Sequence, residues 1–307
     1  MEATWRWAAI TAVAPIAWGA TYFVTLHLLP HGYPFWGGAL RALPAGLILL
    51  AVTRRLPRGS WWWRSLVLGT LNMGAFFALV YVAAQLLPTS IASTVMALSP
   101  VPLMLLGWAL LAQRPAIPAV VGAALGIAGV VVMLAGGGGS IDGWGLAASL
   151  TAMLMSSVGF VLARRWSDGV DALSLSAWQL IAGGLVLLPP ALLIEGAPPA
   201  IDAVSLGGFA FVSIVAGAIA FACWFSGLKH LDAGVVGLIG LLNPATGVVL
   251  GTVLAGESFT PRQVVGLCLV AAGVLLGQPA LSAVVARTAR RRRSRALLVR
   301  TPNGGEQ

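Results

Sequence analysis

The sequence predicts an all-α polytopic membrane protein in which ten transmembrane helices form two inverted five-helix repeats. Three observations favour this fold class. Hydrophobic residues make up 59% of the 307 residues and charged residues only 9%, and the mean hydropathy is +0.93, which excludes an ordinary soluble protein. Ten apolar runs each approach the length of about 20 residues that spans a bilayer as a helix. The second half of the chain also repeats the first.

The ten apolar runs supply the predicted transmembrane helices. Inside a bilayer only a helix or a closed barrel satisfies its own backbone hydrogen bonds, and each run has the length of a helix. Short connections predict that neighbouring helices pack antiparallel. In chain order the runs cover residues 8–28, 35–53, 66–86, 90–112, 117–135, 144–163, 173–194, 205–227, 233–255 and 262–283.

An internal duplication divides these helices into two sets of five. Residues 87–130 align without a gap with residues 231–274, and residues 41–50 align in the same way with residues 179–188. Because each half has an odd number of spans, the second half enters the membrane from the opposite side, which is the design of inverted repeats. The expected divisions are a first repeat over residues 1–142, a second over residues 143–283 and a basic cytoplasmic tail over residues 284–307.

The net charge of +9 lies mainly on one side of the predicted topology. With the N-terminus inside, the inner loops and the tail hold nearly all the arginines, and Arg262 is the single Lys or Arg in the outer loops. This asymmetry follows the positive-inside rule, so we expect a multi-pass protein of a bacterial plasma (inner) membrane with both termini cytoplasmic. Tail arginines 290–293 are expected to contact anionic lipid. We expect no nucleic-acid partner.

Proline interrupts two predicted helices near the middle of the bilayer. Pro100 lies in the fourth run and Pro244 in the ninth, at equivalent positions of the repeats. Proline has no amide hydrogen and displaces the carbonyl four residues before it, which predicts free carbonyls at Met96 and Gly240. Such a break is either a tolerated kink or part of a binding site. We expect Pro100, Gly240 and Pro244 to act in gating, with the glycine-rich ninth helix the more mobile. Met96 and Asn243 are expected to contact substrate.

Side chains on the first helix of each repeat predict the wall of a cavity. Trp18 and Tyr22 are four residues apart and share a helix face. The duplication places Ser156 and Phe160 at the equivalent positions. Rings with polar edges suit an amphipathic or ring-bearing solute, so these four residues are expected to bind substrate. The alternative is that they only pack against neighbouring helices.

The third helix of each repeat offers further candidates. Asn72 and Phe76 share one face, whereas Tyr81 falls about 180° away at 100° per residue. The face of Asn72 corresponds in the second repeat to a face that includes Trp224. We expect Asn72, Phe76 and Trp224 to bind substrate. Alternatively, Asn72 forms a hydrogen bond to a neighbouring helix, which is worth on the order of 1 kcal/mol.

Arg41 is the single basic residue deep within a predicted span. Its neighbours on the helix, among them Gly37, Gly38 and Ala45, form a stripe of small residues that lets another helix approach. The guanidinium is therefore expected to face protein, either in a structural role or as a contact for a substrate carboxylate. The glycines of the fifth and tenth helices predict a scaffold or a dimer contact, and the protein is expected to be a monomer or a homodimer.

Several motifs occur in an order that resembles a known family. They are Trp18-Gly-Ala-Thr-Tyr22, the arginine of the second helix, Leu98-Ser-Pro100, Leu254-Ala-Gly-Glu-Ser-Phe-Thr-Pro-Arg-Gln-Val-Val-Gly266 and Ala272-Gly-Val274. With the duplication, they resemble the EamA family of the drug/metabolite transporter superfamily over about residues 8–280. The stretches 177–189 and 54–63 more narrowly resemble the PecM-like members.

The resemblance implies ten helices in two inverted repeats around a central cavity that is open to one side at a time. It also implies that the first, third, fourth, sixth, eighth and ninth helices line the path, and that amino acids, other metabolites or toxic compounds are exported. The chain departs from the family pattern at Gln113, where an acidic residue is often found, while the repeat counterpart Glu257 is retained. A symmetric pair of acidic gates is therefore not expected.

These features predict a secondary transporter that exports small organic metabolites, such as amino acids, aromatic metabolites or drug-like compounds, by alternating access. The alternative is a membrane-embedded regulatory or sensor protein on the same scaffold. The spans hold no metal-ligand cluster, nucleophile–base pair or phosphate loop, so we expect neither an enzyme nor a cofactor nor a bound metal. Because no carboxylate lies deep within a span, the expected mechanism is uniport or coupling through another group.

Overall fold

The structure, a computed structural model, is all-helical over the residues that it describes, which are 2–96, 98–111, 117–135, 141–166, 169–230, 239–240, 242–256 and 260–277. The described helices are α1 (Glu2–Leu28), α2 (Pro34–Thr53), α3 (Trp61–Gly69), η1 (Thr70–Gly74), α4 (Ala75–Leu86), α5 (Thr89–Met96), α6 (Pro100–Leu111), α7 (Ile117–Ala135), α8 (Gly143–Trp166), α9 (Ala172–Pro190), η2 (Ala191–Glu195), α10 (Ala203–Ala210), η3 (Phe211–Ile219), α11 (Ala220–His230), α13 (Leu242–Val253) and α14 (Pro261–Gly277). The segments labelled η are π-helical.

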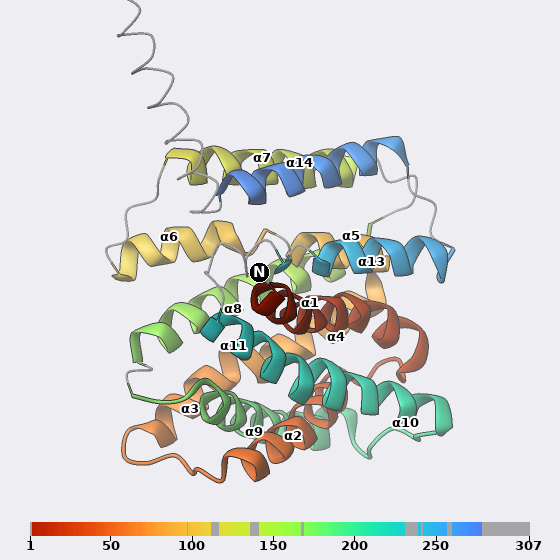
Figure 1. The fold of residues 1–307 in the computed structure, drawn as a ribbon. Helices are drawn as coiled ribbons and strands as arrows, with labels where there is room; N and C mark the ends of the chain where they lie inside the picture. The colour runs from red at the N-terminus through yellow and green to blue at the C-terminus, as the bar shows by residue number, and fades with distance from the viewer. Residues whose placement is uncertain are drawn as a thin grey trace, which may run out of the picture.

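The helices lie in stacked layers (Figure 1). The outermost layer consists of α7 and α14, and the next contains α5, α6 and α13. A third layer holds α1, α4, α8 and α11, and the last holds α2, α3, α9 and α10. Contacts between the two halves of the chain occur throughout, because α7 packs on α14, α2 on α9, α1 on α11 and α5 on α13.

Six described helical stretches are long and apolar enough to cross a membrane, which makes the chain a polytopic membrane protein. They are Arg6–Leu28, Pro34–Thr53, Trp61–Leu86, Gly143–Ala163, Ala172–Glu195 and Ala203–Trp224. Shorter apolar helices cover Val120–Gly129, Leu242–Val253 and Pro261–Gly273. Large apolar side chains such as Leu193 and Ile117 are exposed on the outer surface, as expected where lipid is the solvent. Residues 231–238 of the ninth predicted run and the predicted tail 284–307 lie outside the described residues.

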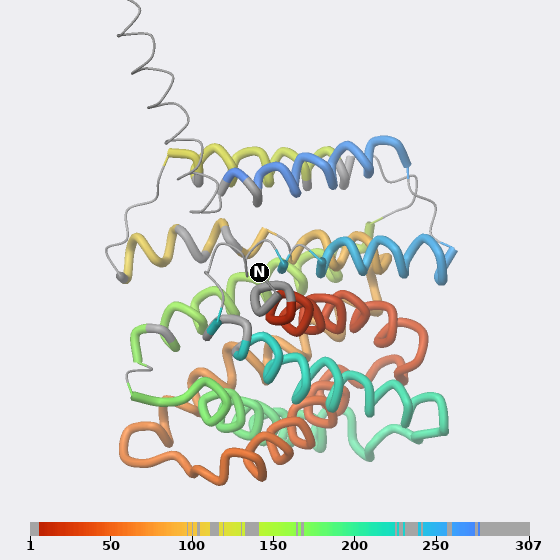
Figure 2. The backbone as a smooth tube through the Cα atoms, in the orientation of Figure 1, coloured from red at the N-terminus to blue at the C-terminus, as the bar shows by residue number. Residues whose placement is uncertain are grey.

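The fourth predicted run is broken rather than kinked. α5 ends at Met96 and α6 begins at Pro100, and the two lie end to end in one layer (Figure 2). The expectation of a free carbonyl at Met96 is wrong, because this oxygen accepts a 3.1 Å hydrogen bond from the backbone N–H of Ser99. Leu98 donates in the same way to Val95 at 3.2 Å. These three-residue bonds satisfy backbone groups that a regular helix would lose at the proline.

The third and eighth predicted runs contain π-helical turns that the sequence pattern did not reveal. The turn η1 spans residues 70–74 and η3 spans 211–219. The duplication aligns residues 70–74 with 214–218, so both turns occur at equivalent positions. A π-helical turn changes the direction in which the following side chains point and leaves carbonyls free to bind other groups, and such turns are frequent at functional sites.

Glycine allows the second helix of one half to pack against the second helix of the other. A Cβ atom on Gly46 of α2 would lie 2.9 Å from the backbone nitrogen of Ile181 in α9. A Cβ on Gly184 of α9 would lie 3.2 Å from the backbone nitrogen of Leu43 in α2. The duplication aligns Gly46 with Gly184 and Leu43 with Ile181. The same contact is therefore made twice, with the roles of the helices exchanged.

The pair α7 and α14 repeats this arrangement. A Cβ on Gly129 would lie 2.6 Å from the carbonyl oxygen of Gly266, and a Cβ on Gly273 would overlap the carbonyl oxygen of Gly122. Gly122 aligns with Gly266 and Gly129 with Gly273. The fifth and tenth predicted helices thus pack tightly on each other through their glycines.

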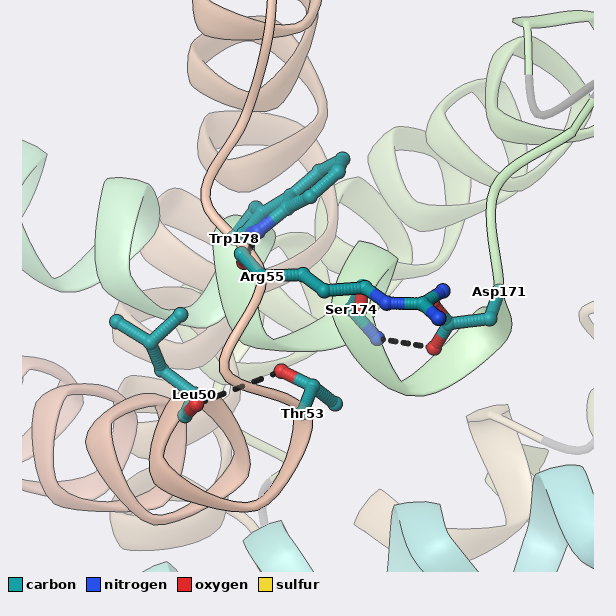
Figure 3. A network of polar contacts seen from close by, with 6 residues as sticks. All are labelled: Leu50, Thr53, Arg55, Asp171, Ser174 and Trp178. Atoms are coloured by element: carbon teal, nitrogen blue, oxygen red, sulfur yellow. Dashed lines mark hydrogen bonds and ion pairs between the residues drawn. The ribbon is translucent and has the colours of Figure 1, made fainter.

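A polar network joins the α2–α3 loop to the start of α9 (Figure 3). Arg55 Nη1 lies 3.0 Å from Asp171 Oδ2, and Asp171 Oδ1 accepts a 2.9 Å hydrogen bond from the backbone N–H of Ser174. Trp178 Nε1 donates to the carbonyl oxygen of Arg55 at 2.6 Å. Asp171 is thus the N-cap of α9 and links it to the α2–α3 loop, so the network joins the two halves of the chain.

We expect Asp171 to stabilise the protein modestly. Burial raises the pKa of its carboxyl group, but the hydrogen bonds from Ser174 and the charge of Arg55 outweigh it and lower the pKa overall. Asp171→Ala removes the cap and the ion pair and should cost about 1 kcal/mol. Asp171→Asn keeps a capping oxygen and should cost a few tenths of a kcal/mol, because the pair is largely exposed.

The pH dependence of this contribution follows from the direction of the shift. A lowered folded pKa means that the stabilisation is complete above the unfolded value of about 3.9 and is lost as the pH falls through the folded value. Thermal unfolding in detergent should therefore separate the wild type from Asp171→Asn at about pH 6, and the difference should shrink as the pH falls below about 3.9. A difference that grows on acidification would contradict this assignment.

Candidate functional site

An aromatic cluster lies where α1 meets the π-helical turn η3 and α11. Trp18 Nε1 donates a 2.9 Å hydrogen bond to the carbonyl oxygen of Ala216 in η3. The centroid of its ring lies 5.4 Å from that of Phe221 and 5.3 Å from that of Trp224 in α11. Because the indole N–H is already bonded, Trp18 presents mainly its apolar ring to any further group. The aromatic cluster of Trp18, Phe221 and Trp224 thus joins one ring of the first half to two of the second.

The predicted break in the ninth helix reaches this cluster. A Cβ on Gly19, the neighbour of Trp18, would overlap the backbone carbonyl oxygen of Asn243. A Cβ on Gly240 would lie 3.6 Å from the Trp224 ring. The side-chain oxygen Oδ1 of Asn243 is buried and has no hydrogen-bond partner. The structure therefore brings Trp18, Trp224, Gly240 and Asn243 together, as four of the predicted site residues.

Asn72 is buried between the helices, in a position compatible with both of its predicted roles, a hydrogen bond to a neighbouring helix and a contact with substrate. Its Nδ2 donates a 2.7 Å hydrogen bond to Gln179 Oε1 of α9, so the contact with a neighbouring helix exists. Its Oδ1 is buried without a partner, and a Cβ on Gly159 of α8 would overlap the amide group. Asn72 thus holds η1 against α8 and α9 and keeps one acceptor free.

Arg41 is buried between α1, α2 and α4, with 8% of its surface exposed. Its guanidinium carbon lies 4.0 Å from the centroid of the Phe77 ring of α4. Its Nε is buried and has no hydrogen-bond partner. The ring of Phe77 packs in the same hydrophobic cluster as Trp18. Arg41 therefore faces protein, as the stripe of small residues predicted.

The remaining candidates are spread more widely. Phe76 packs against both the cluster that Trp18 contacts and the cluster that contains Tyr22, and Met96 packs against the latter. Ser156 is buried and donates to the carbonyl oxygen of Met153 at 3.1 Å.

Phe160 is 50% exposed, so the structure does not bring it into the cluster despite its shared face with Ser156. Pro244 is buried in α13, and Pro100 begins α6. Tyr81 donates to the carbonyl oxygen of Pro30 in the α1–α2 loop, away from the cluster.

Gln179, Phe77 and Phe221 were not among the predicted site residues. Gln179 occupies the position that the duplication aligns with Arg41, and a polar residue at the counterpart of a buried arginine was the signal that could have identified it. The positions of Phe77 and Phe221 depend on the π-helical turns before them, which helical periodicity does not predict. The described residues hold no group of His, Cys, Asp or Glu that could bind a metal ion.

Known proteins resemble the chain over most of its length. The sequence profile described as "EamA-like transporter family" matches residues 5–135 and 143–277. Protein PecM of Dickeya dadantii (strain 3937) is 34% identical over 267 residues, which cover 86% of this chain and 90% of that protein. The "Probable amino-acid metabolite efflux pump" of Salmonella typhimurium is 27% identical over 282 residues, covering 85% and 91%. A solved crystal structure superposes with a TM-score of 0.65 at 24% identity, covering 91% and 98%, and so shares the fold.

Proposed function

Since this chain belongs to the EamA-like transporter family, we propose that it is a secondary transporter that exports small organic metabolites by alternating access. Export is proposed because one relative is named a probable efflux pump. The solute is expected to have an apolar or ring-bearing part, because Trp18, Phe221 and Trp224 form the centre of the candidate site. This cluster, built from both halves of the chain, is the observation that carries the proposal.

Two inverted repeats are the proposed basis of the movement. The reciprocal contacts of Gly46 with Ile181 and of Gly184 with Leu43 are those of a self-complementary interface around a two-fold axis. Five spans in each half would place that axis in the membrane plane. Rocking of one half against the other would then open the cluster to one side at a time, because each half contributes one wall of it.

The proposed topology places both termini in the cytoplasm of a bacterial cell. The network of Arg55 and Asp171 gathers the basic α2–α3 loop and the α8–α9 loop at one end of the bundle. At the other end, Glu195 accepts hydrogen bonds from the backbone N–H groups of Phe35 and Trp36 at 2.7 and 2.8 Å. The excess of arginine at the first end supports a cytoplasmic location for it.

Transport by the purified protein tests the proposal. Proteoliposomes are loaded with amino acids, aromatic metabolites or dyes, and efflux is compared with that of empty liposomes and of liposomes that carry Trp18→Ala. Saturable efflux of at least one class, slowed in the variant, is the expected result. If no solute moves with the wild type, the proposal is wrong. A steep dependence on an imposed pH gradient that survives changes at Glu257 and His27 would exclude uniport.

A further inference from the structure

Arg41 is a buried cation without a counter-charge in the part of the chain that the structure describes. With 8% of its surface exposed, it makes neither a salt bridge nor a hydrogen bond there, and the contact described for its guanidinium is the face of Phe77 at 4.0 Å. A charge removed from water costs several kcal/mol unless it is paired. Only part of this cost is offset by a cation–π contact, which is worth about 2 kcal/mol when desolvated.

The four carboxylates whose side chains the structure describes have other partners. Each accepts a hydrogen bond from a backbone N–H at the start of a helix, and these acceptors are Asp142, Asp171, Glu195 and Asp202. Glu195 caps α2 itself, yet its bonds go to Phe35 and Trp36. These residues precede Arg41 by five and six positions, which is about 8–9 Å along a helix. Glu195 therefore neutralises the N-terminus of α2 rather than Arg41.

In the second repeat an uncharged residue occupies the position equivalent to Arg41, and it has a hydrogen-bond partner. Gln179, the counterpart of Arg41, accepts a 2.7 Å hydrogen bond from Asn72. The counterpart of Asn72 is Ala216, whose side chain cannot form a hydrogen bond. Its carbonyl oxygen is taken by Trp18. The side-chain hydrogen bond between Asn72 and Gln179 thus has no counterpart between Ala216 and Arg41.

We propose that Arg41 binds the carboxylate of the transported solute, while the ring or apolar part of the same solute packs on the aromatic cluster of Trp18, Phe221 and Trp224. This inference rests on the proposed function and names its substrate class as organic carboxylates with an apolar group. Phe77 covers one flat face of the Arg41 guanidinium. The N–H groups of Arg41 lie in the plane of the guanidinium and point away from its edge, not toward the ring. That edge matches a carboxylate, which it can bind through two parallel hydrogen bonds.

Paired solutes that differ in a single group, a carboxylate or its uncharged carboxamide, test the inference. Binding of radiolabelled indole-3-acetate and tryptophan to detergent-solubilised protein is compared with binding of their carboxamides, and efflux of the same four compounds is measured from proteoliposomes. The wild type should prefer the carboxylates. Arg41→Gln should weaken carboxylate binding about tenfold or more, as expected for a charge-assisted hydrogen bond, and should change carboxamide binding less than about twofold. Arg41→Lys should keep part of the preference.

Arg262→Gln is the matched control, because Arg262 is exposed at the start of α14, and it should change neither class. Equal loss of carboxylate and carboxamide binding in Arg41→Gln would overturn the inference and leave a structural role. A wild type that binds no carboxylate of the set, or binds the carboxamides equally well, would also overturn it, and this comparison does not depend on the folding of any variant.

The two proposals fail in different ways. Efflux without a preference for carboxylates would retain the transporter and reject the role of Arg41. Carboxylate binding that depends on Arg41 without efflux of any solute would retain the binding site and reject the transporter.

Discussion

Gly183→Val is expected to prevent the bundle from forming its normal core. A Cβ at position 183 would lie 2.6 Å from the carbonyl oxygen of Gly69 and 2.6 Å from the backbone nitrogen of Gly74. Both neighbours are backbone atoms of the third predicted helix, so no side chain can rotate away. Overpacking a core commonly costs about 1–3 kcal/mol, and valine at this contact should reach or exceed the upper end of that range. The measurement is the yield of monodisperse protein and its thermal midpoint in detergent.

Gly207→Val provides the matched control for this change. Gly207 lies in α10, and a Cβ there would meet no atom within 4 Å. The control therefore introduces the same β-branched side chain into a helix without a clash, and it should change stability only by the difference in helix propensity, which favours valine by well below 1 kcal/mol. Equal stability of the two variants would mean that α9 does not approach the third helix as closely as described.

Replacing Pro244 with alanine should slow transport more than replacing Pro100. Proline disfavours a continuous helix by about 3 kcal/mol, so its removal from α13 should favour a straight ninth helix and slow the opening of the site by about tenfold. The fourth helix should respond by less than about twofold, because the bonds from Ser99 to Met96 and from Leu98 to Val95 maintain its break without the proline.

Efflux rates and binding affinities of the two variants separate gating from recognition. Pro244→Ala should lower the maximal rate while the dissociation constant of the solute stays within about twofold, because a straightened helix changes the barrier between states rather than the contacts of the bound state. Equal rates in Pro100→Ala and Pro244→Ala would contradict the asymmetry between the two proline-containing helices.

Much of the fold was predictable, because the bilayer limits a spanning segment to about 20 apolar residues. The predicted runs 35–53 and 117–135 correspond to α2 (Pro34–Thr53) and α7 (Ile117–Ala135) within one residue. The sequence pattern did not reveal the π-helical turns. Such a turn shifts the backbone hydrogen bonds by one residue, and this shift does not change the hydropathy of the segment. The prediction for the carbonyl of Met96 was wrong because the helix ends there. The chain then forms a tighter turn, in which the N–H of Ser99 donates to this carbonyl.

The site was predictable only in part. Trp18 and Trp224 come together in the structure because they are aromatic residues on the expected faces of helices that line the same region. Phe160 does not join them and is half exposed. Helical periodicity places it on the same face as Ser156, but it does not give the tilt of the helix, which decides whether both residues reach the interior. For Gln179 the sequence offered one signal, its alignment with Arg41. Its bond to Asn72 could not be predicted, because a hydrogen bond between two helices depends on how both pack.

Accessibility of one buried position from both sides of the membrane tests alternating access most directly. The chain has two cysteines, so replacing Cys223 and Cys268 with alanine gives a cysteine-free background. Ser156→Cys then adds a thiol of nearly the same size at a buried predicted site. A control that keeps only Cys268, which lies exposed on the outer surface of α14, should react slowly from both sides, because lipid excludes charged reagents there.

The account predicts that a membrane-impermeant thiol reagent labels Ser156→Cys from the cytoplasmic side and from the outer side, and that a saturating solute on one side changes the ratio of the two rates. Labelling from one side alone, unaffected by any transported solute, would contradict it.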